Sequence, residues 1–318
     1  MVFSPRPLDP HFPLALGTSP LGVGTTPGTP GGDAAVTTAL ALLREPHALI
    51  DTSNNYAGGR SEAVLGEALA ALTPEERRSA AARLITKVDE DPLTGRFDGD
   101  RVRRSLDESL TRLGLDTVPL LHLHDPYGIT VSEAMAPGGA GHTLVQLREE
   151  GLVARIGIAA GPVPLLARYV DTGAFDAVLC HNRMTLVDDS ARPLFADARA
   201  RGMITFNAAP YGAGLLVRGA VPGVGYGYQP ASEELLAWTR SLEELCAAHA
   251  VPLAALALQF SLRDPLVDCT VVGVSSPERL RSLHALRDHA IPAELWDAVR
   301  ALSPAPTPVD DRAYGEAP

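Results

Sequence analysis

Four polar side chains stand at intervals that suit one repeated strand–helix unit. Asp51 closes the stretch ALID, Lys87 closes RLITK and His124 closes PLLHLH, at intervals of 36 and 37 residues, and Tyr56 lies in the loop after Asp51. A tyrosine with its free pKa of about 10 is a poor acid or base at neutral pH, but a neighbouring ammonium lowers that pKa. A carboxylate keeps the lysine charged, and a histidine can orient a substrate oxygen. The set therefore predicts a general acid–base centre for interconverting a carbonyl and an alcohol.

These residues can meet only if the chain brings the ends of successive strands together. Short β-rich apolar runs alternate with longer stretches of helical period, which is typical of a parallel sheet. We expect strands at residues 14–17, 48–52, 83–88, 118–124, 155–159, 175–180, 203–208 and 270–274. Eight units favour a closed (β/α)8 TIM barrel with long active-site loops, although an open doubly wound sheet gives a similar pattern. In a barrel, the four side chains lie together at the carboxyl-end rim.

Helix signals and stretches rich in glycine and proline fill the intervals between strands. Helices are predicted at 61–71, beginning with Ser61, at 99–113, with an apolar stripe at every fourth residue, and at 278–286, after the cap Ser276-Pro277. Residues 125–141, 217–230 and the tail after 303 are predicted as loops. The first two follow the fourth and seventh strands, so they should overhang the pocket. No repeat or linker divides the chain, and we expect one domain over residues 1–318.

Composition narrows the class of protein. The formal net charge is −11, which repels phosphate backbones and excludes nucleic acid as an expected partner. The three cysteines, Cys180, Cys246 and Cys269, are odd in number and lack metal-clip spacing, so a reducing cytoplasm is expected. The N-terminal stretch is broken by prolines and lacks the apolar core of a signal peptide. Because no apolar run approaches a length of about 18 residues, we expect no membrane partner.

An ordered set of motifs resembles one known family. The stretch IDTSNNYAGGRSEAVLGEAL resembles the aldo-keto reductase signature, and ITKV, LHLHDP, GLVARIGIA, APYGAGLL and VVGVSSPERL follow in that family's order. The similarity spans about residues 14 to 300. It implies that Tyr56 donates the proton in reduction and accepts it in oxidation, and that Lys87 lowers its pKa. Asp51 would hold Lys87, and His124 would orient the substrate oxygen.

The resemblance also implies a nicotinamide cofactor, NADP or NAD, bound in extended form on the barrel rim without any metal. The absence of a Gly-x-Gly-x-x-Gly motif after the first strand agrees. The implied cofactor-binding positions follow the last three strands: His181, Asn182, Pro210, Tyr211, Gly212, Gly214, Gly273, Ser275, Ser276 and Arg279. Several departures concern the cofactor: Ala159-Ala160 replace the family's Ser-Asn, His181 replaces a Gln, Ala208 replaces the stacking aromatic, Gly273 replaces a lysine, and Ser282-Leu283 replace the adenine-edge Glu-Asn pair. A 2′-phosphate would meet one arginine and two serines, which predicts a modest preference for NADP.

One branch of the family matches more of the pattern. The segments TSNNY, TKVDEDPLTGRFDGDRV, LHDP, HNR and NAAPYG are similar to those of bacterial aldose 1-dehydrogenases, which oxidise the anomeric hydroxyl of a sugar to a lactone. The two asparagines would suit a polyhydroxy ligand, and an aromatic content of 5% is low for a site that binds flat ketones. The predicted substrate-binding residues are Asn54, Asn55, Tyr127, Tyr226 and Tyr228; the last two could instead simply cover the rim.

Other interpretations of the same residues stay open. His122 points to the same side of its strand as His124, and we interpret it as a buried core histidine. A His-x-His pair also occurs in metal-dependent barrel hydrolases, but Asp51, Lys87 and Cys180 make a poor ligand set, so no metal site is predicted. A general aldehyde or ketone reductase is the main alternative. A regulatory subunit that only binds the cofactor is disfavoured by the intact set of four side chains.

Overall fold

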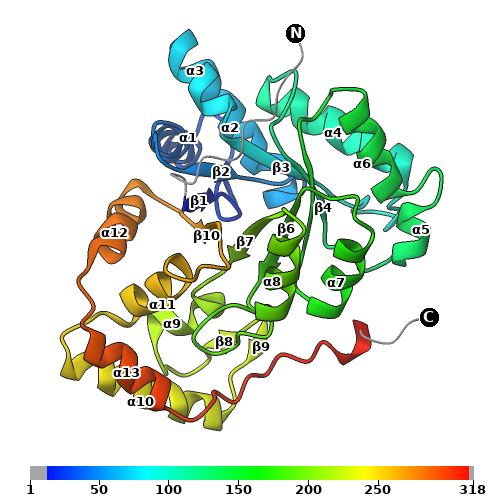
Figure 1. The fold of residues 1–318 in the computed structure, drawn as a ribbon. Coiled ribbons are helices and arrows are strands. Elements are labelled where there is room, and N and C mark those ends of the chain that lie inside the picture. Colours follow the sequence, from blue (N-terminus) through cyan, green and yellow to red (C-terminus); the bar gives the residue numbers. More distant parts are fainter. Residues whose placement is uncertain (1–12, 315–318) are drawn as a thin grey trace.

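The computed structural model describes residues 13–314, which form a closed barrel of eight parallel strands (Figure 1). The order around the barrel is β1-β10-β7-β6-β5-β4-β3-β2. The strand bounds are β1 Leu14–Gly17, β2 Leu49–Asp51, β3 Leu84–Val88, β4 Leu121–His124, β5 Ile156–Ala160, β6 Ala177–His181, β7 Ile204–Ala208 and β10 Cys269–Gly273. The predicted barrel and its eight strands are confirmed. The fourth strand starts later than predicted, because Val118 makes only an isolated bridge with Val153.

Helices follow the strands along the chain and cover the outside of the barrel (Figure 1). The helices around the barrel are α1 Pro30–Leu43, α2 Arg60–Ala70, α4 Gly99–Leu113, α6 Ala140–Glu149, α7 Val163–Asp171, α8 Arg192–Ala200, α11 Leu253–Leu262 and α12 Pro277–Asp288. The further helices are α3 Pro74–Ala81, α5 Val131–Met135, α9 Leu215–Arg218, α10 Glu233–Ala248 and α13 Ala293–Ala301. Short 3-10 turns occupy Tyr56–Gly59, Gly212–Gly214 and Arg312–Tyr314.

Local capping explains most of the helix boundaries. α4 has the predicted bounds: the Asp98 side chain accepts a hydrogen bond from the Arg101 N–H, and Gly114 ends the helix with a φ of 63°. The predicted Ser276 cap of α12 is confirmed, because its hydroxyl accepts from the Arg279 N–H at 3.3 Å. The predicted Ser61 cap of α2 is wrong. The helix begins at Arg60, and the Ser61 hydroxyl instead donates to the carbonyl of Thr18.

The barrel interior is a packed core. Apolar side chains from alternate strand positions fill it: Ala15, Leu49, Ile85, Leu120, Ala159, Ala177, Leu179, Phe206, Cys269 and Val271. His122 is fully buried among them, and its ring meets Phe206 edge to face at 5.6 Å between centroids. Burial lowers the pKa of His122 well below its usual value, so the ring is neutral. The interpretation of His122 as a core residue agrees with this position.

Two predicted loops contain regular structure. Residues 125–141 include α5, which begins with a reciprocal capping box between Thr130 and Glu133, and the first turn of α6. Residues 217–230 include the end of α9 and a hairpin in which β8 Gly225–Tyr226 pairs with β9 Gln229–Pro230. Both predictions were wrong in detail, because short capped turns and two-residue strands leave little periodic signal in a sequence rich in glycine and proline.

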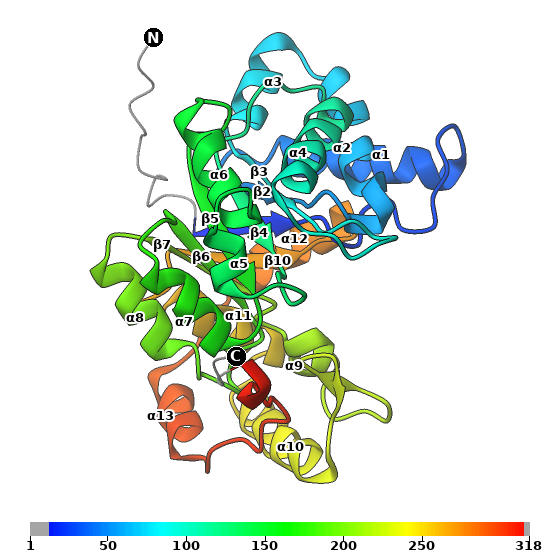
Figure 2. The same cartoon turned by 90° about the vertical axis from the view of Figure 1, so that its right-hand side faces the viewer.

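The tail after α13 runs back along the barrel towards α7 (Figures 1 and 2). It is held by Asp311, whose carboxylate accepts from the Arg183 guanidinium at 2.6 Å and from the Val163 N–H at 3.0 Å. The Tyr314 ring packs 5.6 Å from that of Tyr127, which lies in the loop after β4. The tail therefore contacts loops at the carboxyl ends of the strands.

Within residues 13–314, no single helix is both long enough and apolar enough to cross a membrane. Helices α10 and α11 meet that test only when taken together, and a 96° bend separates them.

Candidate active site

The ends of β2 and β3 bring Asp51, Lys87 and Tyr56 into contact. The Lys87 ammonium donates to Asp51 Oδ1 at 2.8 Å, to the Thr52 carbonyl at 2.7 Å and to the Tyr56 hydroxyl at 3.1 Å. The Lys87 side chain is only 1% exposed, and that of Asp51 is 3% exposed. The ammonium has three donors and three acceptors, so its charge is fixed in one place beside the phenol.

A buried polar network beneath the loop holds Tyr56. The Asn54 amide donates to the Ser105 carbonyl at 3.0 Å and to Glu108 at 3.1 Å, and its oxygen accepts from Arg101 at 2.9 Å. Arg112 donates to the Asn54 carbonyl at 2.9 Å. Asn54 is therefore turned towards α4, and its side-chain amide supports the loop from below. This differs from the expectation that Asn54 would face a ligand.

Glycine is required where this loop turns into α2. Gly59 has a φ of 85°, and a Cβ there would lie 2.5 Å from the guanidinium carbon of Arg112. That guanidinium also pairs with Glu62 at 3.1 Å, and the Glu62 carboxylate is fully buried. In the Gly-Gly-Arg-Ser-Glu segment, Gly59 and Glu62 both lie against Arg112 of α4. This one arginine therefore holds the Tyr56 loop against α4.

His124, at the end of β4, lies beside the same tyrosine. The Tyr56 and His124 rings meet edge to face, with 5.8 Å between their centroids. Asp89 Oδ1 lies 2.6 Å from His124 Nδ1, and Ser53 Oγ lies 3.2 Å from the same nitrogen. The Ser53 hydroxyl donates to Asp89 Oδ2. Neither Asp89 nor Ser53 was predicted from the sequence. The spacing alone could have identified Asp89, because it stands two residues after Lys87 and side chains two apart on a strand share a face.

Electrostatics set the protonation states. Burial raises the pKa of Tyr56 to about 12, although the Lys87 charge acts in the lowering direction. Lys87 therefore lowers the pKa of Tyr56 as expected, but the net pKa is raised, because desolvation of the phenolate outweighs the effect of the lysine. Burial also disfavours the Lys87 ammonium, but Asp51 and Tyr56 more than offset it, and the pKa of Lys87 is raised.

A third carboxylate, Asp125, lies between two histidines at the mouth of the barrel. Its oxygens are each 3.7 Å from an Nε2, one of His124 and the other of His181, and the Tyr127 hydroxyl donates to it at 2.8 Å. Burial alone would raise the pKa of Asp125, but His181 and His124 lower it to about 2. The sequence analysis missed Asp125 because it follows a strand directly and reads as an ordinary turn residue.

Backbone strain marks the same rim. Asp125, Asn182 and Ala209 each follow the last residue of a strand, and their φ angles are 44°, 59° and 56°. Residues other than glycine rarely adopt this left-handed conformation, and such positions cluster at functional sites. The strain therefore marks the carboxyl ends of β4, β6 and β7 independently of the side chains there.

The predicted cofactor-binding residues lie along the ends of β6, β7 and β10. Asn182 is buried, its Oδ1 has no hydrogen-bond partner within the described part of the chain, and its Nδ2 lies 3.1 Å from His181 Nδ1. Pro210, Tyr211, Gly212 and Gly214 form the turn after β7. A Cβ at Gly212 would lie 2.3 Å from the Tyr226 ring, so this approach needs glycine.

The end of β10 and the start of α12 complete the row. Gly273 and Ser275 are exposed, and Ser276 caps α12. The Arg279 guanidinium is exposed and has no ion-pair partner among the residues that the structure describes. An unpaired amide oxygen, a helix N-terminus and an unpaired cation fit a carboxamide at one end of the row and an anionic group at the other. These residues thus fit a nicotinamide dinucleotide in extended form.

The predicted substrate-binding tyrosines lie in different surroundings. Tyr226 is fully buried, with its hydroxyl 2.7 Å from that of Thr185 and 2.8 Å from the Asn182 carbonyl. Tyr228 is 75% exposed, and its ring lies 5.8 Å from His181. Tyr127 is 43% exposed, and Asn55 is also exposed. Tyr226 therefore supports the Asn182 turn, whereas the other three side chains are exposed.

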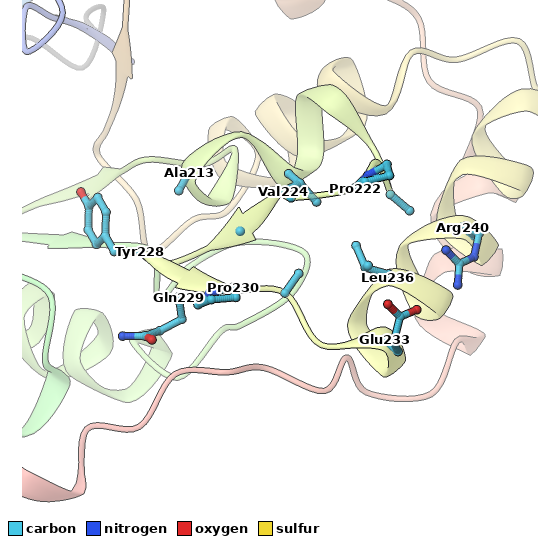
Figure 3. A pocket seen from close by; sticks show the side chains of 13 residues that line it. Ala213, Pro222, Val224, Tyr228, Gln229, Pro230, Glu233, Leu236 and Arg240 are labelled. Carbon is cyan, nitrogen blue, oxygen red and sulfur yellow. The ribbon is translucent and has the colours of Figure 1, made fainter.

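A pocket of about 870 Å³ lies next to this rim. It is bounded by the β8–β9 hairpin and α10, and Figure 3 shows Tyr228 and Arg240 at its two ends. Residues 13–314 contain no group of three or more His, Cys, Asp or Glu side chains arranged to hold a metal ion.

Comparison with known proteins places the chain in a family. The family model described as "Aldo/keto reductase family" matches residues 13–304 of the chain. The chain is similar to pyridoxal 4-dehydrogenase of Microbacterium luteolum (31% identity, 64% of this chain and 62% of that protein). It is also similar to L-galactose dehydrogenase of Arabidopsis thaliana (32%, 82% of each) and to D-threo-aldose 1-dehydrogenase of a Pseudomonas species (35%, 67% and 64%). The first and third matches span slightly less than two thirds of those proteins.

A solved structure supports the same fold. The holo form of an aldo-keto reductase from Bacillus halodurans superposes with a TM-score of 0.75 at 21% identity, covering 94% of this chain and 95% of that one. The chain belongs to the aldo-keto reductase family. It is accordingly an NAD(P)-dependent oxidoreductase of a family whose members act on small carbonyl compounds or sugars.

Proposed function

We propose that the protein oxidises the anomeric hydroxyl of an aldose to the lactone, with NADP or NAD as hydride acceptor. The observation that carries the proposal is the contact of the Lys87 ammonium with both Asp51, at 2.8 Å, and the Tyr56 hydroxyl, at 3.1 Å. The names of two relatives, an L-galactose dehydrogenase and a D-threo-aldose 1-dehydrogenase, support a sugar substrate. The several polar groups around Asp125 also suit a polyhydroxy ligand better than a flat apolar one.

Tyr56 is the proposed acid–base residue. In oxidation its phenolate takes the proton of the anomeric hydroxyl as the C1–H electron pair leaves carbon and the carbonyl of the lactone forms. In reduction its hydroxyl gives that proton back to the alkoxide oxygen. A bound nicotinamide supplies the hydride acceptor in the first direction and the donor in the second. Lys87 stabilises the phenolate by charge, Asp51 holds Lys87, and His124 orients the reacting oxygen.

The remaining residues bind the two ligands. Cofactor binding is proposed for His181, Asn182 and the turn from Pro210 to Gly214, with Gly273, Ser275, Ser276 and Arg279 at the adenosine end. A single arginine there supports a modest preference for NADP. Substrate hydroxyls are proposed to contact Asn55, Tyr127 and Tyr228, together with the Asp125 carboxylate. We propose that Asn54 and Tyr226 support the loops that carry these residues and do not contact the substrate.

A substrate screen tests the proposal. Purified protein is given aldoses of each configuration, pyridoxal and simple aldehydes, with each cofactor in its oxidised and reduced form, and nicotinamide absorbance is followed. Oxidation of an aldose, with the lactone identified by mass spectrometry and no turnover by Lys87→Met, is the expected result. Turnover of aldehydes but of no aldose would show that the substrate is a general carbonyl compound and not a sugar. Cofactor binding without any turnover would leave only a regulatory role.

A further inference from the structure

The surroundings of His124 Nδ1 decide which ring nitrogen carries the proton. Asp89 Oδ1 lies 2.6 Å from Nδ1, and Ser53 Oγ lies 3.2 Å from it. Ser53 is fully buried, Asp89 is 7% exposed, and the Ser53 hydroxyl donates its own proton to Asp89 Oδ2. The same Oδ2 accepts from the Asn55 N–H at 3.1 Å. A carboxylate has no proton to give, and the hydroxyl has used its own. Both neighbours of Nδ1 can therefore only accept, so Nδ1 carries the proton.

Nε2 faces the open side of the site. The nearest carboxylate oxygen there belongs to Asp125 and is 3.7 Å away, which is too far for a hydrogen bond. A neutral imidazole protonated at Nδ1 presents a bare Nε2 that can only accept. The oxygen of a carbonyl substrate is itself an acceptor and requires a donor. With Nδ1 protonated, Nε2 carries a proton and can donate a hydrogen bond only when the ring is an imidazolium.

We propose that Asp89 is a positioning residue that keeps the proton of His124 on Nδ1, so that Nε2 donates to the substrate oxygen only as the charged imidazolium. The inference rests on the proposed function, because it places a carbonyl or hydroxyl oxygen beside Nε2. It distinguishes this chain from an enzyme in which a neutral histidine donates from Nε2, since the carboxylate at Nδ1 excludes that form.

Several charged or titratable groups lie around the ring, and beyond Asp125 stands His181, whose Nε2 is 3.7 Å from that carboxylate. Lys87 lies on β3 beside Asp89, Tyr56 is in the loop after β2, His122 is two residues earlier on β4, and Asp125 follows the ring directly. Burial and Lys87 disfavour the imidazolium, but Asp89, with help from Asp125, outweighs them, and the pKa of His124 is raised. His122 and Tyr56 are neutral near neutral pH. The Asp89 carboxylate therefore favours the imidazolium form of His124.

The reduction rate isolates this effect. Tyr56 has a pKa of about 12 and stays protonated as the acid through neutral and moderately alkaline pH. A loss of reduction within that range must therefore come from the loss of the Nε2 proton of His124. For the native protein, kcat/KM for reduction should be constant at low pH. Above the pKa of His124 it should fall by about 10-fold per pH unit.

Asp89→Asn should remove the pH dependence. Its amide oxygen can keep the Ser53 and Asn55 donors, which turns the NH2 group towards Nδ1. Nδ1 then accepts, and neutral His124 carries its proton on Nε2. Reduction should become nearly independent of pH above neutrality, and at lower pH it should be about 10- to 100-fold slower because a neutral donor replaces a charged one. Asp125→Asn is the matched control: it also removes a carboxylate near the ring but should leave the proton on Nδ1.

NMR of isotope-labelled histidine reads the tautomer without any turnover. The His124 signals are assigned by their loss in His124→Gln, and ring-nitrogen shifts are followed from acid to alkaline pH. The expected result is an imidazolium that titrates, as the pH rises, to the Nδ1–H form in the native protein and to the Nε2–H form in Asp89→Asn. A native ring that titrates to Nε2–H would overturn the proposal, as would an unchanged pH profile in Asp89→Asn.

Failure of the two proposals can be told apart. If no substrate is turned over, the proposed function fails, and the NMR titration still decides the state of His124. If Asp89→Asn does not fold, the native titration and the native pH profile decide it together.

Discussion

Lys87→Met tests the centre of the site, because it removes one charge and keeps a long, unbranched side chain. The Lys87 ammonium contacts Asp51 Oδ1, the Thr52 carbonyl and the Tyr56 hydroxyl, all in a buried setting. Methionine leaves the Asp51 carboxylate without its counter-ion, and Asp51 Oδ2 already lacks a hydrogen-bond partner among residues 13–314. Removing one partner of a buried pair costs about 3–5 kcal/mol of unfolding free energy.

The expected result has a stability part and an activity part. Chains of 150–250 residues lose roughly 2–4 °C of melting temperature per kcal/mol, so we expect Tm to fall by about 5–15 °C in this somewhat longer chain. Turnover should be lost in both directions. The double variant Lys87→Met/Asp51→Asn should regain part of the Tm, because no unpaired buried charge remains. It should not regain turnover. Removal of the exposed Arg300–Asp297 pair by Arg300→Ala is the control and should cost less than about 1 kcal/mol.

The pH dependence has a definite sign. Because the pKa of Lys87 is raised above its usual 10.5, the contribution of the lysine to stability is fully present at neutral pH. It is lost only as the pH rises beyond that value. The difference in Tm between native protein and Lys87→Met should therefore stay constant from neutral to weakly alkaline pH. Unchanged Tm and retained turnover in Lys87→Met would refute the assignment, and no recovery in the double variant would refute the explanation by an uncompensated charge.

Three further variants probe other parts of the site. Tyr56→Phe removes the transferable proton and keeps the ring, so turnover should fall by at least about 100-fold while calorimetry still detects cofactor binding; near-normal turnover would exclude Tyr56 as the acid. Arg279→Ala should weaken NADP binding by about 10- to 100-fold and leave NAD binding unchanged in fluorescence titration, whereas equal loss of both would assign Arg279 to the shared adenosine. Asn54→Ala leaves the buried groups of Arg101 and Ser105 without partners and should lower unfolding free energy by about 1–3 kcal/mol in urea denaturation; an unchanged midpoint would argue against a supporting role.

Most of the barrel could be predicted from the sequence, although its closure could not be told there from an open doubly wound sheet. Apolar runs of strand length alternate with amphipathic stretches, and the spacing of about one strand–helix unit between Asp51, Lys87 and His124 places them on successive strand ends. Parallel strands share a carboxyl-end rim, so topology alone brings these side chains to one place. Caps with local signatures, such as those at Asp98 and Ser276, were equally accessible because their hydrogen bonds span only three residues.

Only the tertiary structure decided what each polar group faces. Asn54 and Tyr226 could each have faced a ligand, but Asn54 turns towards Arg101 on α4 and Tyr226 towards the Asn182 carbonyl. Their partners are 44 or more residues away along the chain, so no local pattern reveals them. The pKa of Tyr56 is a second case. The sequence supplies the lysine that lowers it, but the desolvation that raises it to about 12 depends on how tightly the loop closes over the ring. The proton on His124 is likewise set by Asp89, whose approach to 2.6 Å exists only once β3 and β4 are paired.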